Sequence, residues 1–162
     1  MARVSALTQK LQALLRSQRV AALGTTTDDG APLVSMVPFA LEPQLRCFVI
    51  HVSGLAAHTR NLEARSRVSL MVMRSEVEGE PVHDLPRVTF DGSADIPERE
   101  SERWQACRAA YLARFPEAEP MTELGDFRFV AIDTSSARQV AGFGAARTLE
   151  GEALRLALSA PG

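Results

Sequence analysis

The stretch from Arg46 to Arg74 changes its hydrophobic period twice. Apolar residues first alternate with other residues, which predicts a β-strand, and Ser53-Gly54 then breaks the pattern. Residues 55–64 follow the three- and four-residue spacing of a short helix, and alternation resumes at 68–72 as a second strand. A helix start presents unpaired backbone N–H groups and the positive end of the helix dipole. The junction between strand and helix is therefore predicted to be an anion or phosphate site.

The remaining periodicity predicts further strands and helices on both sides of this unit. Helices are expected at 7–15, with Ser5 as N-cap, and at 104–115; strands are expected at 20–27, 32–41, 87–96 and 127–132. Asp28-Asp29-Gly30 predicts a hairpin turn, and Pro38 places its strand at a sheet edge or a bulge. Ser135-Ser136 is expected to turn the chain into residues 137–148. Residues 150–160 are compatible with a short helix or a strand.

This element order favours a mainly β protein, an antiparallel β-barrel with flanking helices. Regular βαβ alternation is missing, which argues against a doubly wound nucleotide-binding fold. No repeat or linker divides the chain. Residues 1–162 are therefore predicted to form a single domain, with a core at about 5–148 and a C-terminal extension at 149–162.

Charge and composition limit the partners that the protein is expected to bind and the cell compartment in which it is expected to work. A formal net charge of −2 gives no electrostatic footprint for nucleic acid. No window approaches the roughly 18 apolar residues of a membrane span, and the N-terminus lacks an uninterrupted apolar segment. Cys47 and Cys107 have no CxxC spacing and are read as reduced, buried thiols, so a cytoplasmic location is expected.

Three segments resemble the FMN-binding split barrel of the pyridoxamine 5′-phosphate oxidase-like superfamily. They are the hairpin 20–30 with SMVPF at 35–39, SGLAAHTRNL at 53–62 with RVSL at 67–70, and GFGAA at 142–146. The last two together look like the haem-utilisation branch of that superfamily. The middle segment is fairly specific, whereas the hairpin alone would be weak.

The resemblance implies a homodimer with two FMN sites in grooves between the subunits, and a flavin-dependent oxidoreductase acting on a small molecule. Strands 35–38 and 51–53 would flank the flavin, the next helix start would hold its phosphate, and the Gly142-Phe143-Gly144 turn would close the groove. The cofactor-binding residues implied in this way are Ser35, Met36, Val37, Pro38, His51, Val52, Ser53, His58, Thr59, Arg60, Asn61, Arg138, Gln139 and Phe143. No catalytic residue is assigned.

The chain departs from its relatives at two places. The phosphate-binding Arg-Lys pair of the vitamin-forming oxidases falls on Ala57 and His58. The haem-utilisation relatives bind haem through a histidine near the C-terminus, and here none follows His83.

Two alternatives to the flavin reading stay open. One is a haem-binding or haem-utilisation protein of the same fold, with His51 or His58 as the candidate iron ligand. The other is a cofactor-free split-barrel binding module. Met36, Met71 and Met73 fit either a core or a cofactor pocket. No metal site is predicted, because the histidines lack further spaced ligands.

Overall fold

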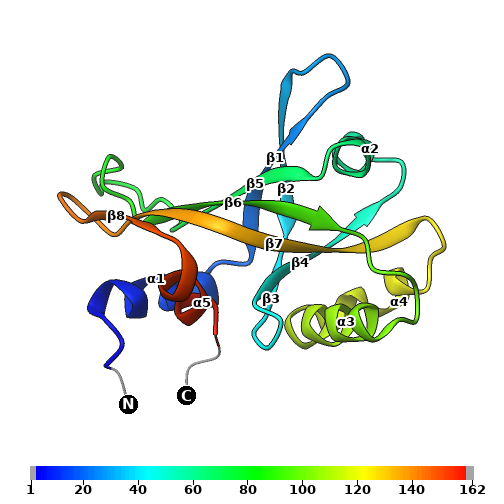
Figure 1. Cartoon of the computed structure of the whole chain (residues 1–162). Helices are drawn as coiled ribbons and strands as arrows, with labels where there is room; N and C mark the ends of the chain where they lie inside the picture. Colours follow the sequence, from blue (N-terminus) through cyan, green and yellow to red (C-terminus); the bar gives the residue numbers. More distant parts are fainter. Residues whose placement is uncertain (1–2, 160–162) are drawn as a thin grey trace.

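The computed structural model describes residues 3–159 as one curved sheet with helices packed around it (Figure 1). The strands lie in the order β2-β1-β5-β6-β7-β4-β3, and β8 pairs with β7. Every pairing is antiparallel. The strands β2 and β4 also approach each other, which closes the sheet into a half-barrel. The predicted fold class is therefore confirmed.

The elements have the following bounds. The strands are β1 Val20–Thr26, β2 Pro32–Pro38, β3 Ala40–Glu42, β4 Cys47–Ser53, β5 Arg67–Met73, β6 Arg87–Asp95, β7 Phe127–Val140 and β8 Ala146–Leu149. The helices are α1 Ala6–Ser17, α2 Ala57–Ala64, α3 Glu102–Arg114, α4 Glu119–Thr122 and α5 Gly151–Leu158, with a 3-10 turn η1 at Pro116–Ala118.

Serine caps begin the two longest helices. The Ser5 hydroxyl accepts a hydrogen bond from the Thr8 N–H at 3.1 Å, and the Ser101 hydroxyl accepts one from the Trp104 N–H at 3.2 Å. These contacts satisfy backbone donors that the first turn of a helix leaves unpaired. Both helices were predicted from their apolar spacing, and Ser5 was predicted as a cap. The α4 turn was not foreseen, because Pro116 and Pro120 indicated only an end to α3.

The predicted hairpin forms, and its second arm lies at the sheet edge. Gly30 adopts a φ of 85° in the connecting turn, a conformation that favours glycine. Strand β2 ends at Pro38, and the chain then changes partner, because β3 pairs with β4 rather than with β1. A proline lacks the N–H that a ladder needs, so Pro38 sits where pairing stops.

The expected turn at Ser135-Ser136 is wrong, because β7 runs unbroken through both residues. Its ladder with β6 pairs Asp91 with Ser136 and Gly92 with Thr134, which leaves Ser135 as one extra residue. This is a β-bulge rather than a turn. The bulge needs a glycine on the facing strand, since a Cβ on Gly92 would lie 2.4 Å from the Asp133 carbonyl oxygen.

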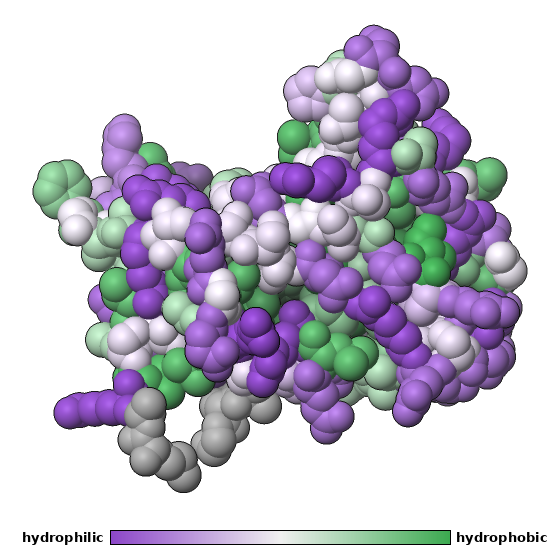
Figure 2. Space-filling view, viewed as in Figure 1, coloured by the Kyte–Doolittle hydropathy of each residue, from purple (hydrophilic) through white to green (hydrophobic). Residues whose placement is uncertain are grey.

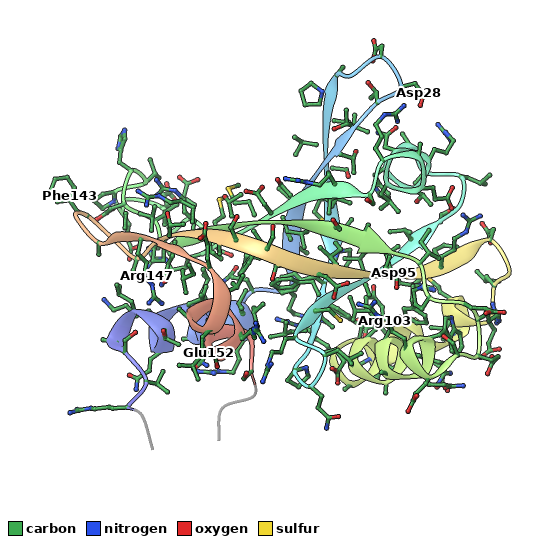
Figure 3. The ribbon with its side chains drawn as sticks, in the orientation of Figure 1. Asp28, Asp95, Arg103, Phe143, Arg147 and Glu152 are labelled. Atoms are coloured by element: carbon green, nitrogen blue, oxygen red, sulfur yellow. The ribbon has the colours of Figure 1, made fainter. Side chains whose placement is uncertain are left out.

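Two hydrophobic clusters lie on opposite faces of the sheet. The larger one fills the half-barrel and includes Phe48 and Phe90, together with buried leucines of α1 and α5. The smaller one lies between α3 and β4, β7, and it holds Cys47 and Cys107, which are both buried and unpaired as predicted. Arg103 of α3 contacts Asp95 and Asp133 at its margin (Figure 3).

The helices divide between the two halves of the sheet (Figure 1). Helices α1 and α5 pack against each other beneath one half, and α3 with α4 covers the other half. Helix α2 lies beside the β1–β2 hairpin. Within residues 3–159, none of the helices has the length and apolar character that crossing a membrane requires.

Candidate functional site

Strand β2 and the start of α2 bring two predicted site residues together. The Ser35 Oγ lies 2.9 Å from the His58 Nδ1, although the residues are 23 positions apart. Burial lowers the pKa of His58, so the imidazole is neutral at pH 7. The contact to Ser35 fixes the ring and leaves its Nε2 as the nitrogen available to a ligand.

The other predicted phosphate donors of α2 are engaged within the chain. The Thr59 hydroxyl donates to the Ser53 carbonyl at 2.6 Å, and the Asn61 amide donates to the Thr25 hydroxyl at 3.1 Å. Arg60 donates to the Leu55 carbonyl at 2.9 Å, although its side chain is exposed. The helix start therefore offers few free donors to a phosphate.

His51 lies apart from this pair, on the face of β4 that α3 covers. Its ring stacks on Phe127, with centroids 5.1 Å apart, and lies 4.5 Å from the Phe129 centroid. Burial lowers the pKa of His51 to about 4, and its Nδ1 has no hydrogen-bond partner within residues 3–159. The neighbouring Val52 points the other way, into the half-barrel core. The ring is therefore a neutral member of an aromatic cluster.

A groove opens on the outer face of β1, which no helix of residues 3–159 covers. The middle of β1 contributes two small residues to this face, Ala22 and Gly24, which lie between Met36 and Val34 of β2 on one side and β5 on the other. Val20 and Thr26 share the face at the two ends of the strand. The side chains of Val34 and Met36 are 70% and 65% exposed, which is high for apolar residues. Of the other predicted residues of β2, Val37 is buried in the core, and Pro38 ends the strand opposite Val20.

The groove continues as a hollow of about 410 Å³. Met71 and Met73 of β5 line it together with Met36, and Arg74 stands at its rim. The sequence pattern singled out the methionines, but it missed Ala22 and Gly24. In the sequence, the signal for a groove floor is the pair Ala22 and Gly24, two small residues on the same face of one strand.

The C-terminal site residues lie on and beyond β7, which β5 and β6 separate from β1. Arg138 is exposed and donates to the Thr148 hydroxyl at 3.3 Å. Gln139 is buried on the opposite face, where it donates to the Leu7 carbonyl and accepts from Arg147. Phe143 stands at the tip of the β7–β8 hairpin, directed away from the body of the molecule (Figure 3). The structure does not bring these three residues to Ser35 and His58 within one chain.

An antiparallel half-barrel with flanking helices and a groove beside its edge strand defines the split-barrel class. The family model described as pyridoxamine 5′-phosphate oxidase matches residues 7–141, so the chain belongs to that family.

Several similar proteins within this class are named for haem. The heme oxygenase HutZ of Vibrio cholerae is 35% identical over 133 residues, which cover 82% of this chain and 74% of that protein. A non-canonical heme oxygenase of Arabidopsis thaliana chloroplasts, HOZ, is 35% identical over 125 residues, covering 76% of this chain and 36% of that protein. The structure of a heme binding protein from Mycobacterium smegmatis superposes with a TM-score of 0.83 at 30% identity, covering 96% of this chain and 62% of that one. This chain thus spans less than two thirds of the last two proteins.

Proposed function

We propose that this protein binds haem in the groove over β1. The observation that carries the proposal is the uncovered apolar hollow, which has Ala22 of β1 at its floor and walls that include Met36 and Met71. A flat floor between larger side chains suits a planar ring system. The haem alternative gains support over the flavin reading because three of the similar proteins carry haem names.

The lining residues fit a porphyrin in three respects. The hollow is mainly apolar, which matches the porphyrin faces. Arg74 also lines the hollow; its Nη2 donates to Glu80 at 2.8 Å, and its Nε, which has no hydrogen-bond partner within residues 3–159, is a donor that a propionate carboxylate could engage. Three methionine thioethers, from Met36, Met71 and Met73, also line it. Methionine is one of the side chains that ligate haem iron in proteins, so the groove fits haem without a histidine near the C-terminus.

We also propose that the protein works as a homodimer. The groove has only one side in a single chain, and β2, β1 and β5 present it on a face that no helix of residues 3–159 covers. A two-fold partner would supply the opposite wall and would bury the exposed Val34 and Met36.

The experiment is a haem titration of the purified protein, read by absorbance. A shifted Soret band and a higher unfolding temperature are expected, because a ligand that binds only the folded state raises apparent stability. Variants in which all three groove methionines become leucine should change the band position or weaken binding. Leucine keeps the volume close to that of methionine, so the fold should tolerate the change.

Matched controls separate the possible ligands. Met121→Leu lies outside the groove and should leave the spectrum unchanged. The variants His51→Ala, His58→Ala and His83→Ala test histidine ligation one by one. Loss of the shifted band in one histidine variant alone would assign the iron to that histidine, and an unshifted wild-type spectrum would reject haem binding.

Flavin is the second candidate, and the Ser35–His58 contact favours it. The neutral imidazole and the hydroxyl lie together near a helix start, where the resemblance places the FMN phosphate. The same preparation, incubated with excess FMN and desalted, decides the matter. Retained flavin absorbance would support this reading and the small-molecule oxidoreductase activity it implies, and a colourless protein would reject it.

A further inference from the structure

The two cysteines of the chain meet beneath α3, although they lie far apart in the sequence. Cys47 and Cys107 are fully buried in the smaller hydrophobic cluster, between β4 and α3. Cys47 lies opposite Asp133 in the β4–β7 ladder, and Arg103 of α3 donates to the Asp133 carboxylate at 2.8 Å. Cys107 follows Arg103 by one helical turn, so the two side chains share a face of α3. The strand register and the helix thus bring both thiols to the same place.

The two sulfur atoms lie within hydrogen-bonding reach, and their surroundings make them unequal. The Cys107 thiol donates a hydrogen bond to the Cys47 sulfur. This hydrogen bond and the Arg103 guanidinium lower the pKa of the Cys47 thiol, whereas the hydrogen bond and burial raise the pKa of the Cys107 thiol. The thiolate is the form of cysteine that attacks an oxidant. Cys47 is therefore the more reactive of the two thiols.

Cys47 lies close to the surface, although its side chain is buried. It is the first residue of β4 and follows an exposed turn at residues 44–46. The ion pairs of Arg103 border the cluster and leave the Arg103 side chain 33% exposed (Figure 3). Hydrophilic side chains predominate over α3 and α4 in the space-filling view (Figure 2). A small polar oxidant thus has only a margin of partly exposed ion pairs to pass, and such pairs contribute little stability.

We propose that Cys47 and Cys107 form a site of reversible disulfide formation by hydrogen peroxide, and that Arg103 promotes its first step. The Cys47 sulfur attacks one peroxide oxygen, so that an S–O bond forms, the O–O bond breaks, and the other oxygen leaves as water with the thiol proton. The Cys107 sulfur then attacks the Cys47 sulfur. The S–S bond forms, the S–O bond breaks, and the second oxygen leaves as water with the Cys107 proton. Two thiols and one hydrogen peroxide give one disulfide and two waters.

The disulfide would tie α3 to the first residue of β4. It closes a loop of about 60 residues, which restricts the unfolded chain and should raise the midpoint of thermal unfolding by about 5 °C or more. The site lies under α3, on the half of the sheet that β4 and β7 form, and shares no residue with the hollow over β1. It is therefore independent of the proposed haem function.

The experiment treats the full chain, reduced beforehand, with hydrogen peroxide at neutral pH and then blocks the remaining thiols. Trypsin cleaves after arginine, so the disulfide would join the peptide 47–60 to the peptide 104–108. Mass spectrometry without a reductant detects the joined peptide. Thiol titration in denaturant should fall from two thiols per chain to none, and dithiothreitol should restore both thiols and the original unfolding midpoint.

Substitutions of two arginines on α3 test the role of Arg103. Arg103→Gln should slow disulfide formation about threefold or more, because the cation that favours the Cys47 thiolate is lost. Arg103→Lys keeps the positive charge and should restore most of the rate. Arg108→Gln is the matched control and should react like wild type, since Arg108 also pairs with two carboxylates, those of Glu119 and Glu123. Equal rates in Arg103→Gln and Arg108→Gln would overturn the part assigned to Arg103.

The disulfide itself has its own tests. Cys107→Ala removes the second thiol, so peroxide should leave a sulfenic acid on Cys47, which dimedone traps, and no joined peptide. Met36 is 65% exposed, and its oxidation to the sulfoxide shows that the peroxide dose was sufficient. Oxidised Met36 with both thiols still free would overturn the proposal. Loss of the thiols without the joined peptide, through sulfinic acids or links between chains, would overturn it as well.

Discussion

His51 couples the stability of the protein to pH. Burial lowers its folded-state pKa to about 4, below the usual 6.5, so the unfolded chain binds a proton more readily. The stabilisation that the neutral ring provides is complete above pH 6.5 and is lost as the pH falls toward 4. One pKa unit corresponds to about 1.4 kcal/mol, and solvent screening of this partly exposed ring reduces the total loss to roughly 1–2 kcal/mol.

Urea unfolding at pH 7.5 and pH 5.0 measures this loss. His51→Phe removes the titrating group but keeps an aromatic ring beside Phe127 and Phe129, so the loss of stability at pH 5.0 should become smaller. Some dependence should persist, because burial also lowers the pKa of His58. His83→Phe, in the exposed loop between β5 and β6, serves as the control and should behave like wild type. An unchanged pH dependence in His51→Phe would contradict the role of His51.

The same two histidines show how far residue-level reasoning reaches. The resemblance grouped His51 and His58 around one cofactor, whereas the structure places His58 beside Ser35 of β2 and His51 against Phe127 and Phe129 of β7. Alternation along β4 explains the difference, because His51 shares the face of Cys47 and Val49 that α3 covers. The residues that cover this face belong to α3, more than 50 positions later in the sequence. Local spacing around His51 cannot reveal such a contact.

At the scale of elements, the bulge in β7 depends on one glycine. Gly92→Ala would place a Cβ 2.4 Å from the Asp133 carbonyl oxygen, closer than real contacts allow, so the backbone of β6 or β7 must move. Overpacking of this kind typically costs about 1–3 kcal/mol. The free energy of unfolding should fall by about that amount, measured by chemical denaturation.

A second strand glycine provides the control for this substitution. A Cβ on Gly24 would have its nearest neighbours at 3.7 Å, an ordinary contact distance. Gly24→Ala should therefore be neutral or stabilise the protein by up to about 1 kcal/mol, through the reduced entropy of the unfolded chain. Equal effects of the two substitutions would show that the bulge geometry does not require glycine.

Periodicity predicted the elements well and their partners poorly. The helices α1 and α3 and the strands β1, β2, β4, β5 and β6 follow from apolar spacing and turn residues. The bulge at Ser135 does not, because two polar serines also suit a turn, and only the register with β6 distinguishes the alternatives. The groove was missed for the same reason, since one of its walls comes from β5, which pairs with β1 over a long sequence separation.

At the scale of the molecule, the two halves of the outer sheet face differ. The larger core fills the inner face beneath α1 and α5, and α3 covers the outer face of β4 and β7 with the smaller core. The outer face of β2, β1 and β5 stays open with its apolar groove, which is where the haem proposal places the ligand. Substitutions on this open part of the sheet should therefore affect binding more than folding.

The last helix, α5, contributes to the stability of the larger core. We propose that α5 folds as part of the single domain, because its Leu154, Ala157 and Leu158 belong to the larger core and are at most 3% exposed. Leu154→Ala should then lower the free energy of unfolding by about 2–5 kcal/mol, the usual cost of a cavity in a packed core.

Leu156→Ala makes the same chemical change two residues later on the same helix. Leu156 is 42% exposed, so its truncation should cost little, within about 0.5 kcal/mol. Helix propensity changes equally in both variants, and the difference between them isolates the packing of α5 on the core. A single cooperative transition in wild type, shifted as a whole by Leu154→Ala, is the outcome expected of one domain. A separate early transition, or equal effects of both variants, would instead make 149–162 an independent extension.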